Sequence, residues 1–464
     1  MNTTMNTTMN TTIAAASGLV LVAVLSACSP AGDDASQGQP PATGDLPVVD
    51  VYDITETPSV SDMALDITQT TMNLGGGALD RYLYTLAGDD AVYGAGRPIV
   101  VDAGDTVRLT ASNATDTPTN IHWHGMNVPN DQDGPGIRIE PGASHDYEFT
   151  ATSPGTYWYH SHERPVRDQV DEGMYAPIIV RDPIDASYDL DQVIVLDDWM
   201  VDGATGRTEA VGEVDTVNGR TGDDISPIEI TGGEIAKLRL INASTARTQQ
   251  MSFPVDVRVT HTDGAPLVEP YTTRELAIAP GGRYDVELAP TGGTDETVTI
   301  TNERDEGMVI PVRYTAADAT AAASPFVAPE PTPLDPELLT RTPDVEMTLS
   351  STMGSSGVAW TINGETFPDA ESFDLELGTT YVMRFRNSDV YQLDHPMHIH
   401  GTHFRLLTEN GSPVAEEIWK DTVSIPAGTY VDVAITFDEP GTWMAHCHIL
   451  DHEDGGMMTT IDVA

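Results

Sequence analysis

The sequence predicts an all-β protein made of three copies of one β-sandwich unit. Runs of alternating apolar and polar residues dominate the chain, and long amphipathic helices are hard to find. A pair of motifs recurs three times in the same order. The length of 464 residues also suits about three domains of ordinary size.

The first repeated motif is a glycine followed by a strand that ends in asparagine. Its copies are residues 104–113, 233–242 and 378–387, which read GDTVRLTASN, GEIAKLRLIN and GTTYVMRFRN. Each copy alternates apolar and polar residues, as a strand with one buried face does.

The second motif follows each copy of the first and carries an aspartate four residues after its glycine. Its copies are residues 142–149, 281–288 and 428–435. Two motifs repeated in one order predict three sandwich domains, which we place at 48–185, 186–315 and 344–464. The Ala- and Pro-rich stretch 316–343 is expected to link the last two.

The first 28 residues resemble the signal segment of a bacterial lipoprotein. The apolar run at 13–27 is too short for a membrane span and suits a signal sequence, although no Lys or Arg precedes it. The residues LSAC that end at Cys28 resemble a lipobox, in which the cysteine is lipidated. A plain secretory signal is the alternative.

Residues 29–47 are rich in Pro, Gly, Ser and Asp, which predicts a flexible tether. We therefore expect an exported protein of the periplasm or cell envelope. Lipid chains on Cys28 would anchor it to a membrane.

The charge of the chain excludes a nucleic-acid partner. The chain has 72 acidic residues against 22 Lys plus Arg, a formal charge of −50 that repels phosphate backbones. The same excess of acid suits a halophilic protein, because counterions in high salt screen self-repulsion. An ordinary solvated acidic surface is the alternative.

Ten of the 13 histidines fall in four short clusters, which predicts a metal centre. The clustered residues are His122, His124, His160, His162, His395, His398, His400, His446, His448 and His452. Imidazoles two residues apart on a strand project from one face and can converge on a metal. The remaining three, His145, His261 and His403, are expected to be structural.

Domains 1 and 3 carry matching histidine segments. Residues 154–162 (PGTYWYHSH) match residues 440–448 (PGTWMAHCH) position for position, and an HxHG sequence occurs at 122–125 and again at 398–401. The corresponding region of domain 2, residues 297–303, has no ligands, so domain 2 is expected to be a spacer. Eight matched imidazoles predict one cluster at a pseudo-twofold interface between domains 1 and 3.

Cys447 is expected to belong to a second site. Neighbours in a strand point to opposite faces, so Cys447 faces away from the cluster that His446 and His448 face. His395 and His452 are available on its own side.

A cysteine with two histidines and a weak axial methionine is the pattern of a blue-copper electron-transfer site. Met457 is our choice of axial ligand, Met458 is the alternative, and core packing is the ordinary role of either. A nucleophilic cysteine would need one histidine and an orienting acid, and no CxxC or HExxH sequence indicates zinc.

The four histidine segments resemble the four copper signatures of three-domain multicopper oxidases, in particular the bacterial laccase and cuprous-oxidase branch. Residues 449–458 (ILDHEDGGMM) and 419–423 (WKDTV) support that branch. The resemblance covers about residues 48–464. It implies three cupredoxin-like Greek-key domains, with copper in domain 3 and at the interface between domains 1 and 3.

The resemblance implies four coppers per chain and a role for each ligand. The type 1 copper would take His395, Cys447, His452 and axial Met457. The type 2 copper would take His122 and His398. The type 3 pair would take His124, His160 and His448 on one ion and His162, His400 and His446 on the other. Asp133 and Glu453 match acids that shuttle protons in the family.

The implied activity is the reduction of O₂ to two waters, coupled to four one-electron oxidations of a small reductant. Cuprous oxidases of this branch carry a Met-rich segment in domain 3, whereas residues 341–360 hold only Met347 and Met353. Tyr391 and Leu393 suit a cation site poorly, although Asp394 could orient a phenol or hold a cation. We expect a laccase-like oxidase of phenols and aromatic amines, with a metal-ion oxidase or a non-catalytic copper-binding module as alternatives.

Overall fold

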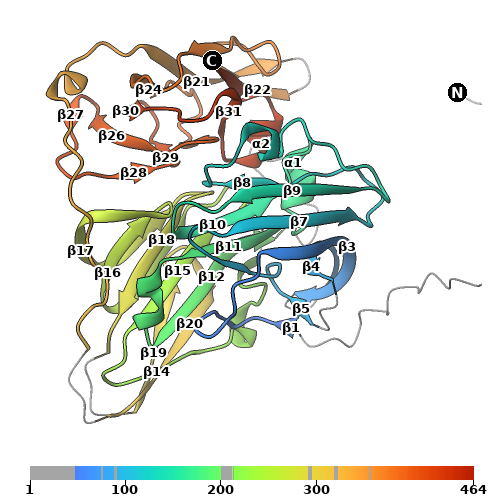
Figure 1. Cartoon of the computed structure of the whole chain (residues 1–464), viewed down its shortest axis with the longest axis vertical. Coiled ribbons are helices and arrows are strands. Elements are labelled where there is room, and N and C mark those ends of the chain that lie inside the picture. Colours follow the sequence, from blue (N-terminus) through green and yellow to red (C-terminus); the bar gives the residue numbers. More distant parts are fainter. Residues whose placement is uncertain are drawn as a thin grey trace, which may run out of the picture. The chain divides into compact units, whose positions relative to one another are not determined.

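The computed structural model describes residues 48–74, 77–87, 91–199, 212, 214–290, 295–317, 322–354 and 357–464. The predicted signal segment, with Cys28, and the tether lie outside these residues. The described chain belongs to one compact unit, which is nearly all strand (Figure 1). Two short α-helices, α1 (Val166–Val170) and α2 (Leu450–Asp454), complete its described regular structure, together with 3₁₀ turns. None of the described helices has the length and apolar character needed to span a bilayer.

The first part of the unit is a sandwich of two four-stranded sheets. One sheet has the order β6 (Ile99–Asp102), β11 (Tyr175–Arg181), β10 (Gly155–His160) and β8 (His122–His124). The other has the order β4 (Gly77–Leu86), β3 (Asp62–Leu74), β7 (Thr106–Asn113) and β9 (Ser144–Thr150). Trp123, Tyr147 and Phe149 are buried in the core of this part.

The middle part is one ten-stranded sheet. Its order is β13 (Val214–Val217), β12 (Leu190–Trp199), β15 (Ala236–Asn242), β18 (Arg283–Leu288), β16 (Gln249–Thr262), β19 (Glu296–Asn302), β20 (Asp305–Thr315) and β14 (Ile228–Thr231). Strand β17 (Ala265–Ile278) pairs with β16, and β2 (Tyr52–Asp53) pairs with β12. The N-terminal strand β2 thus joins the middle sheet, which the repeat pattern did not predict. Strands β1 (Val48–Val49) and β5 (Val92–Tyr93) form a separate two-stranded parallel sheet.

The last part is again a sandwich, of a seven-stranded and a five-stranded sheet. The larger contains β22 (Gly357–Ile362), β21 (Val345–Gly354), β24 (Tyr381–Asn387), β30 (Tyr430–Ile435), β26 (Phe404–Glu409), β27 (Ser412–Pro413) and β28 (Trp419–Lys420). The smaller contains β23 (Phe373–Leu375), β32 (Met458–Val463), β31 (Gly441–Cys447), β25 (His395–Ile399) and β29 (Thr422–Ile425). The prediction of an all-β sandwich fold is confirmed.

The two repeated motifs pair with each other in the same register in every part. The strand of the first motif lies antiparallel to the strand of the second, as β7 with β9, β15 with β18, and β24 with β30. The residue six positions after the first glycine is opposite the motif aspartate each time, as Thr110 with Asp146, Arg239 with Asp285, and Arg384 with Asp432. One strand pairing therefore recurs three times.

The asparagine that ends each first motif fastens two segments together. Its amide nitrogen donates to two backbone carbonyls, and its oxygen accepts the N–H two residues further on. The carbonyls are those of Thr117 and Ile139 for Asn113, Arg247 and Ile278 for Asn242, and Leu393 and Ile425 for Asn387. An asparagine at this position thus has a structural reason, because one of its two bonds in each copy reaches the residue three positions before the glycine of the second motif.

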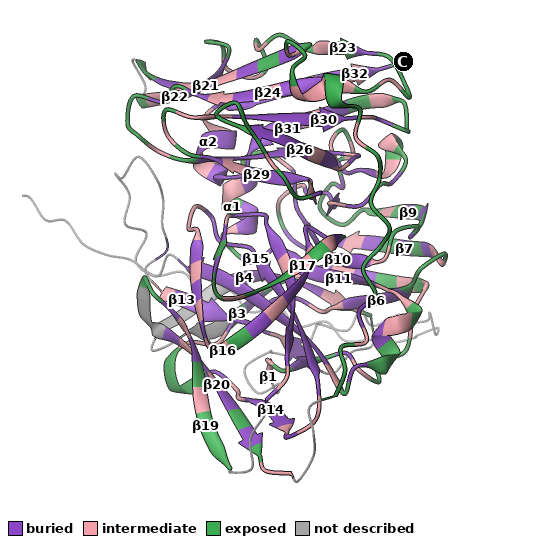
Figure 2. Cartoon of the chain, turned by 90° about the vertical axis from the view of Figure 1, so that its left-hand side faces the viewer, coloured by how far each residue is buried: buried purple, intermediate pink, exposed green. Residues whose placement is uncertain are grey.

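A hydrophobic cluster joins all three parts of the unit. It includes Tyr52, Trp158, Ile241 and Leu450, each at most 3% exposed. Helix α2 closes one end of it and contacts α1, whose first N–H groups, on Val166 and Arg167, donate to the Asp454 carboxylate. Figure 2 shows the buried residues following the strands through the unit. This packing holds the histidine-bearing strands of the first and last parts in place.

Candidate metal centres

Eight histidines from two sandwiches converge in the structure, and we call them the histidine cluster. They are His122, His124, His160, His162, His398, His400, His446 and His448, each at most 5% exposed. Across β8 and β10 His122 pairs with His160, and across β25 and β31 His398 pairs with His446. The two sandwiches present their histidines in the same register, as the matched sequence segments predicted.

Ring nitrogens in the histidine cluster approach one another closely. The Nε2 atoms are separated by 3.4 Å for His122 and His398, by 3.1 Å for His400 and His446, and by 3.3 Å for His162 and His446. His124, His160 and His448 form a further group, with ring centroids 5.0 to 5.7 Å apart. The histidines that the resemblance assigns to each ion therefore lie beside each other.

The chemistry of these donors fits a metal. Among the described residues, His160 Nε2 and both ring nitrogens of His448 are buried without a hydrogen-bond partner. Burial, followed by the neighbouring imidazoles, lowers the pKa of both rings well below the ordinary value, so both are neutral. A buried neutral nitrogen without a partner is costly, and coordination to a metal removes that cost. Imidazole nitrogen is a ligand that copper accepts.

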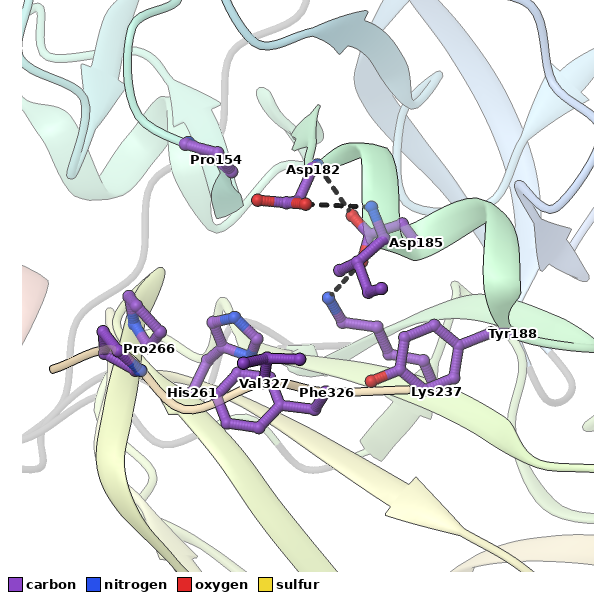
Figure 3. Close-up of a pocket in the computed structure, with 11 residues that line it drawn as sticks. Pro154, Asp182, Asp185, Tyr188, Lys237, His261, Pro266, Phe326 and Val327 are labelled. Atoms are coloured by element: carbon purple, nitrogen blue, oxygen red, sulfur yellow. Dashed lines mark hydrogen bonds and ion pairs between the residues drawn. The ribbon is translucent and has the colours of Figure 1, made fainter. Parts of the chain in front are cut away.

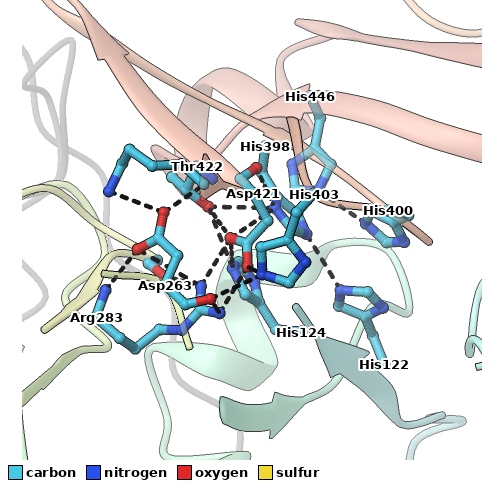
Figure 4. Close-up of polar contacts among 12 residues, drawn as sticks. His122, His124, Asp263, Arg283, His398, His400, His403, Asp421, Thr422 and His446 are labelled. Atoms are coloured by element: carbon cyan, nitrogen blue, oxygen red, sulfur yellow. Dashed lines mark hydrogen bonds and ion pairs between the residues drawn. The ribbon is translucent and has the colours of Figure 1, made fainter. Parts of the chain in front are cut away.

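Two aspartates hold ring nitrogens of the cluster. Asp133, which is 2% exposed, accepts hydrogen bonds from His122 Nδ1 at its carbonyl oxygen (3.0 Å) and from His400 Nδ1 at its carboxylate (2.7 Å). Asp421 accepts from His398 Nδ1 at its carbonyl oxygen (2.9 Å) and from His124 Nε2 at its carboxylate (3.2 Å) (Figure 4). Each aspartate therefore orients one histidine from each sandwich.

Glu453, the second predicted acid, is fully buried beside the cluster. Its carboxylate oxygens lie 3.1 Å from His446 Nδ1 and 3.4 Å from His162 Nε2. Burial acts to lower the pKa of His446, but the Glu453 carboxylate outweighs it and the net shift is upward. Helix α2 carries both Glu453 and His452, so one short helix serves two sites.

Cys447 points to a separate site on the other face of β31, as its strand parity predicted. Its Sγ lies 3.7 Å from His395 Nδ1 and 3.5 Å from His452 Nδ1, and these two nitrogens are 3.1 Å apart. We call these three residues the Cys447 site. Met457 belongs to the same buried core as Cys447, and its carbonyl accepts the Cys447 N–H at 3.1 Å. Met458 instead pairs with His446 on the neighbouring strand.

Trp360 covers the Cys447 site, and no sequence signal indicated it. Its ring stacks on His452 at a centroid distance of 3.7 Å and lies 6.0 Å from His395. Trp360 is on β22, far from the histidine segments in the chain, so spacing could not reveal the contact.

The three remaining histidines have different surroundings. His145 packs edge-on against Tyr147, with ring centroids 4.7 Å apart. His261 lines a cavity of about 440 Å³ that also contains Lys237 and Asp185 and none of the predicted ligands (Figure 3). His403, which was expected to be structural only, has its Nε2 3.4 Å from the Asp421 carboxylate, at the edge of the histidine cluster.

Comparison with known proteins agrees with this geometry. Three family models, each described as "Multicopper oxidase", match residues 93–185, 191–307 and 337–464. The chain is 30% identical over 418 residues to multicopper oxidase MmcO of Mycobacterium tuberculosis, which covers 77% of this chain and 79% of that protein. It is 26% identical over 449 residues to laccase-2 of Botryotinia fuckeliana, which covers 78% of this chain and 76% of that protein.

Solved structures show the same fold. A multicopper oxidase from Pseudomonas thermotolerans superposes with a TM-score of 0.72 at 25% identity, covering 88% of this chain and all of that one. The laccase-like multicopper oxidase CueO of Ochrobactrum superposes with a TM-score of 0.74 at 23% identity, covering 90% and 99%. The chain therefore belongs to the multicopper oxidase family and is a copper-dependent oxidoreductase that uses O₂.

Proposed function

We propose that the chain binds four copper ions in two centres. The type 1 ion takes His395, Cys447 and His452 with Met457 as axial ligand, and the type 2 ion takes His122 and His398. The type 3 ions take His124, His160 and His448, and His162, His400 and His446. The observation that carries the proposal is that Cys447 turns away from His446 and His448 into a donor set of its own.

Copper bound in these sets would supply one-electron chemistry that couples four oxidations of a reductant to the reduction of O₂ to two waters. The chain itself connects the two centres, because Cys447 is joined by peptide bonds to His446 and His448. Asp133 and Glu453 touch ring nitrogens of the cluster and would hold and move protons there. Asp421 would keep His124 and His398 in position.

Phenols and aromatic amines are the proposed reductants. The loop that leads into His395 exposes Val390 (69%) and Tyr391 (39%), an apolar surface that suits an aromatic ring. The Asp394 carboxylate accepts the Ala427 N–H at 3.0 Å, so one of its oxygens is engaged in the loop itself. A curated relative that is named a laccase supports the same class.

Cuprous ion is the second candidate reductant. Met353 is 71% exposed on β21 and offers a soft thioether donor of the kind that Cu(I) prefers. O₂ uptake measured separately with a phenol and with Cu(I) distinguishes the two. Faster uptake with the phenol supports the laccase-like proposal, and faster uptake with Cu(I) replaces it with a metal-ion oxidase.

The copper content tests the proposed centres directly. We expect four coppers per chain and a blue absorption that Cys447→Ser abolishes while the histidine cluster keeps its three ions. A colourless protein, or one copper per chain, would contradict the proposal.

We also propose the domain division 48–185, 186–315 and 344–464, with 316–343 as linker, since the sheets and the three matched regions support it. Export and lipid anchoring through Cys28 are proposed from the LSAC segment. Cys28→Ala should move the protein from the membrane fraction to the soluble fraction of cells.

A further inference from the structure

A turn of domain 2 reaches the histidine cluster. Residues 279–282 connect β17 to β18. A Cβ added to Gly281 would lie 2.8 Å from Cδ2 of His448 and 3.1 Å from Cε1 of His124. The backbone of domain 2 therefore packs directly against two imidazole rings. The φ of Gly281 is +81°, in the left-handed region that glycine adopts at little cost.

The repeat supplies two internal comparisons for this turn. Gly142 and Gly428 occupy the same motif position in domains 1 and 3, with φ of +77° and +74°. A Cβ added to either would meet no atom within 4 Å. The three turns thus share a backbone conformation, and the one in domain 2 differs in what it touches.

Arg283, two residues after Gly281, forms a buried ion pair with Asp421. Its NH1 donates to Asp421 Oδ1 at 2.7 Å and its NH2 to Oδ2 at 2.6 Å, and both side chains are at most 1% exposed. Burial raises the pKa of the Asp421 carboxyl, but the guanidinium outweighs it, and the net pKa lies well below the usual range. Arg283 therefore engages both oxygens of the carboxylate that accepts a hydrogen bond from His124.

The remaining donors of Arg283 fasten it to the rest of the protein. Its Nε donates to the Thr156 carbonyl of domain 1 at 3.2 Å, and its NH2 also donates to the Asp263 carbonyl at 3.0 Å. A Cβ at Gly125 would collide with Arg283 and Asp421, so a glycine at that position leaves room for the pair. Figure 4 shows Arg283 and Asp263 entering from domain 2 beside the histidines.

We propose that Gly281 and Arg283 of domain 2 form a positioning element for the histidine cluster. Arg283 fixes the Asp421 carboxylate, which accepts a hydrogen bond from His124 Nε2 at 3.2 Å and lies 3.5 Å from His398 Nδ1, and Gly281 packs against the rings of His448 and His124. This inference rests on the proposed four-copper function. Domain 2 has no predicted ligand, yet it is more than the spacer that its sequence suggested.

The chemistry requires arginine at this position. A planar guanidinium can hold both oxygens of one carboxylate and still donate to two carbonyls, whereas an ammonium is a point charge with three donors. Arg283→Lys should keep the positive charge and lose the pair of parallel hydrogen bonds to the two Asp421 oxygens. We expect two ions to bind about 10- to 100-fold more weakly, the type 3 ion of His124 and the type 2 ion of His398, because the Asp421 carboxylate contacts both ligands.

Arg239→Lys is the matched control. Arg239 is also in domain 2, is 0% exposed, and holds both oxygens of Asp191 at 2.6 and 2.7 Å. Copper content, the type 2 electron paramagnetic resonance spectrum and the blue absorption are measured for both variants. We expect Arg283→Lys to keep its blue absorption and change its type 2 spectrum, and Arg239→Lys to change neither.

A double-mutant comparison shows whether Arg283 acts through Asp421. Asp421→Asn should weaken the binding of the same two ions by itself, and adding Arg283→Lys should then cause little further loss. Losses that simply add would contradict the inference. Full occupancy and an unchanged spectrum in Arg283→Lys, or equal effects in Arg283→Lys and Arg239→Lys, would also overturn it.

The glycine is tested separately, which keeps the inference falsifiable if Arg283→Lys fails to fold. All three glycine-to-alanine variants should have a lower melting temperature, because alanine is strained at a positive φ. Gly281→Ala should in addition alter the type 3 absorption, whereas Gly142→Ala and Gly428→Ala should not. Identical spectra in the three variants would overturn the role of Gly281. The wild-type copper count tests the proposed function independently of every one of these comparisons.

Discussion

Asp133 and Asp421 occupy equivalent places about the pseudo-twofold that relates the first and last sandwiches. The backbone carbonyl of each aspartate accepts a hydrogen bond from the first histidine of the HxHG segment in its own sandwich. The carboxylate of each aspartate accepts one from the second histidine of the HxHG segment in the other sandwich. The pKa values of the two carboxyls shift in opposite directions. Burial raises the pKa of Asp133, with a smaller opposing effect of His122, whereas Arg283 overcomes burial at Asp421 and lowers its pKa.

This asymmetry predicts different defects for the two aspartates. The pKa of Asp133 is the one that is shifted upward, toward the range in which a carboxyl exchanges protons. Asp133→Asn should therefore slow O₂ reduction by about 10- to 100-fold while copper and blue colour stay. Glu453→Gln should act in the same way, since its carboxylate lies 3.1 Å from His446 Nδ1. Asp131→Asn, an exposed change in the preceding 3₁₀ turn η2 (Asn130–Gln132), is the control. Wild-type turnover in both variants would dismiss the proton relay.

Trp360 is expected to tune the Cys447 site. Trp360→Leu should let water approach His452, which stabilises the more highly charged oxidised site and lowers the reduction potential. Trp360→Phe keeps an aromatic ring and should restore most of the potential. Spectroelectrochemical titration of the blue band measures both, with Trp199→Leu, a buried tryptophan of β12, as the control for lost bulk. An unchanged potential in Trp360→Leu would contradict this role.

Asp171 is expected to make stability depend on pH. Burial, followed by Asp198, raises its pKa from 3.8 to about 7, so folding favours the protonated form. Its contribution to the free energy of unfolding is full below pH 3.8, falls as the pH rises toward 7, and stays lost above that. Asp171→Asn should therefore gain stability over wild type as the pH rises through this window, by an amount of the order of 4 kcal/mol.

Unfolding by denaturant at a series of pH values checks the difference between Asp171→Asn and wild type. Asp168→Asn, an exposed change in helix α1, which ends at the residue before Asp171, is the control and should show the same pH dependence as wild type. A difference that is constant from pH 4 to 8 would show that Asp171 does not titrate in this range.

The charge of −50 predicts a gain of stability in salt. At about 1 M salt the Debye length falls to about 3 Å, so repulsion between exposed carboxylates is screened while buried pairs such as Lys237 with Asp185 are little affected. We expect a higher melting temperature and sustained O₂ uptake in 1 M NaCl. Activity that is highest without salt and lost in molar NaCl would show that the acidic surface is not an adaptation to salt.

Much of the site could be read from local pattern. The spacing of histidines within each strand and the match between residues 154–162 and 440–448 predicted which imidazoles come together, and the parity of β31 predicted that Cys447 serves another site. The placement of Asp133 and Glu453 at the cluster came from resemblance, and no spacing rule alone would have chosen them among 72 acidic residues.

The sequence by itself determined the sandwich class, the threefold repeat and the face of the strand on which each ligand lies, because alternation along a strand is a local property. Only the tertiary structure decided that Arg283, Gly281, Asp421 and Trp360 touch the sites. Their contacts cross between segments far apart in the chain, and alternation states which way a side chain points without stating what it meets. The residue that a side chain contacts across an interface depends on how the domains pack, and this packing leaves no periodic pattern in the sequence.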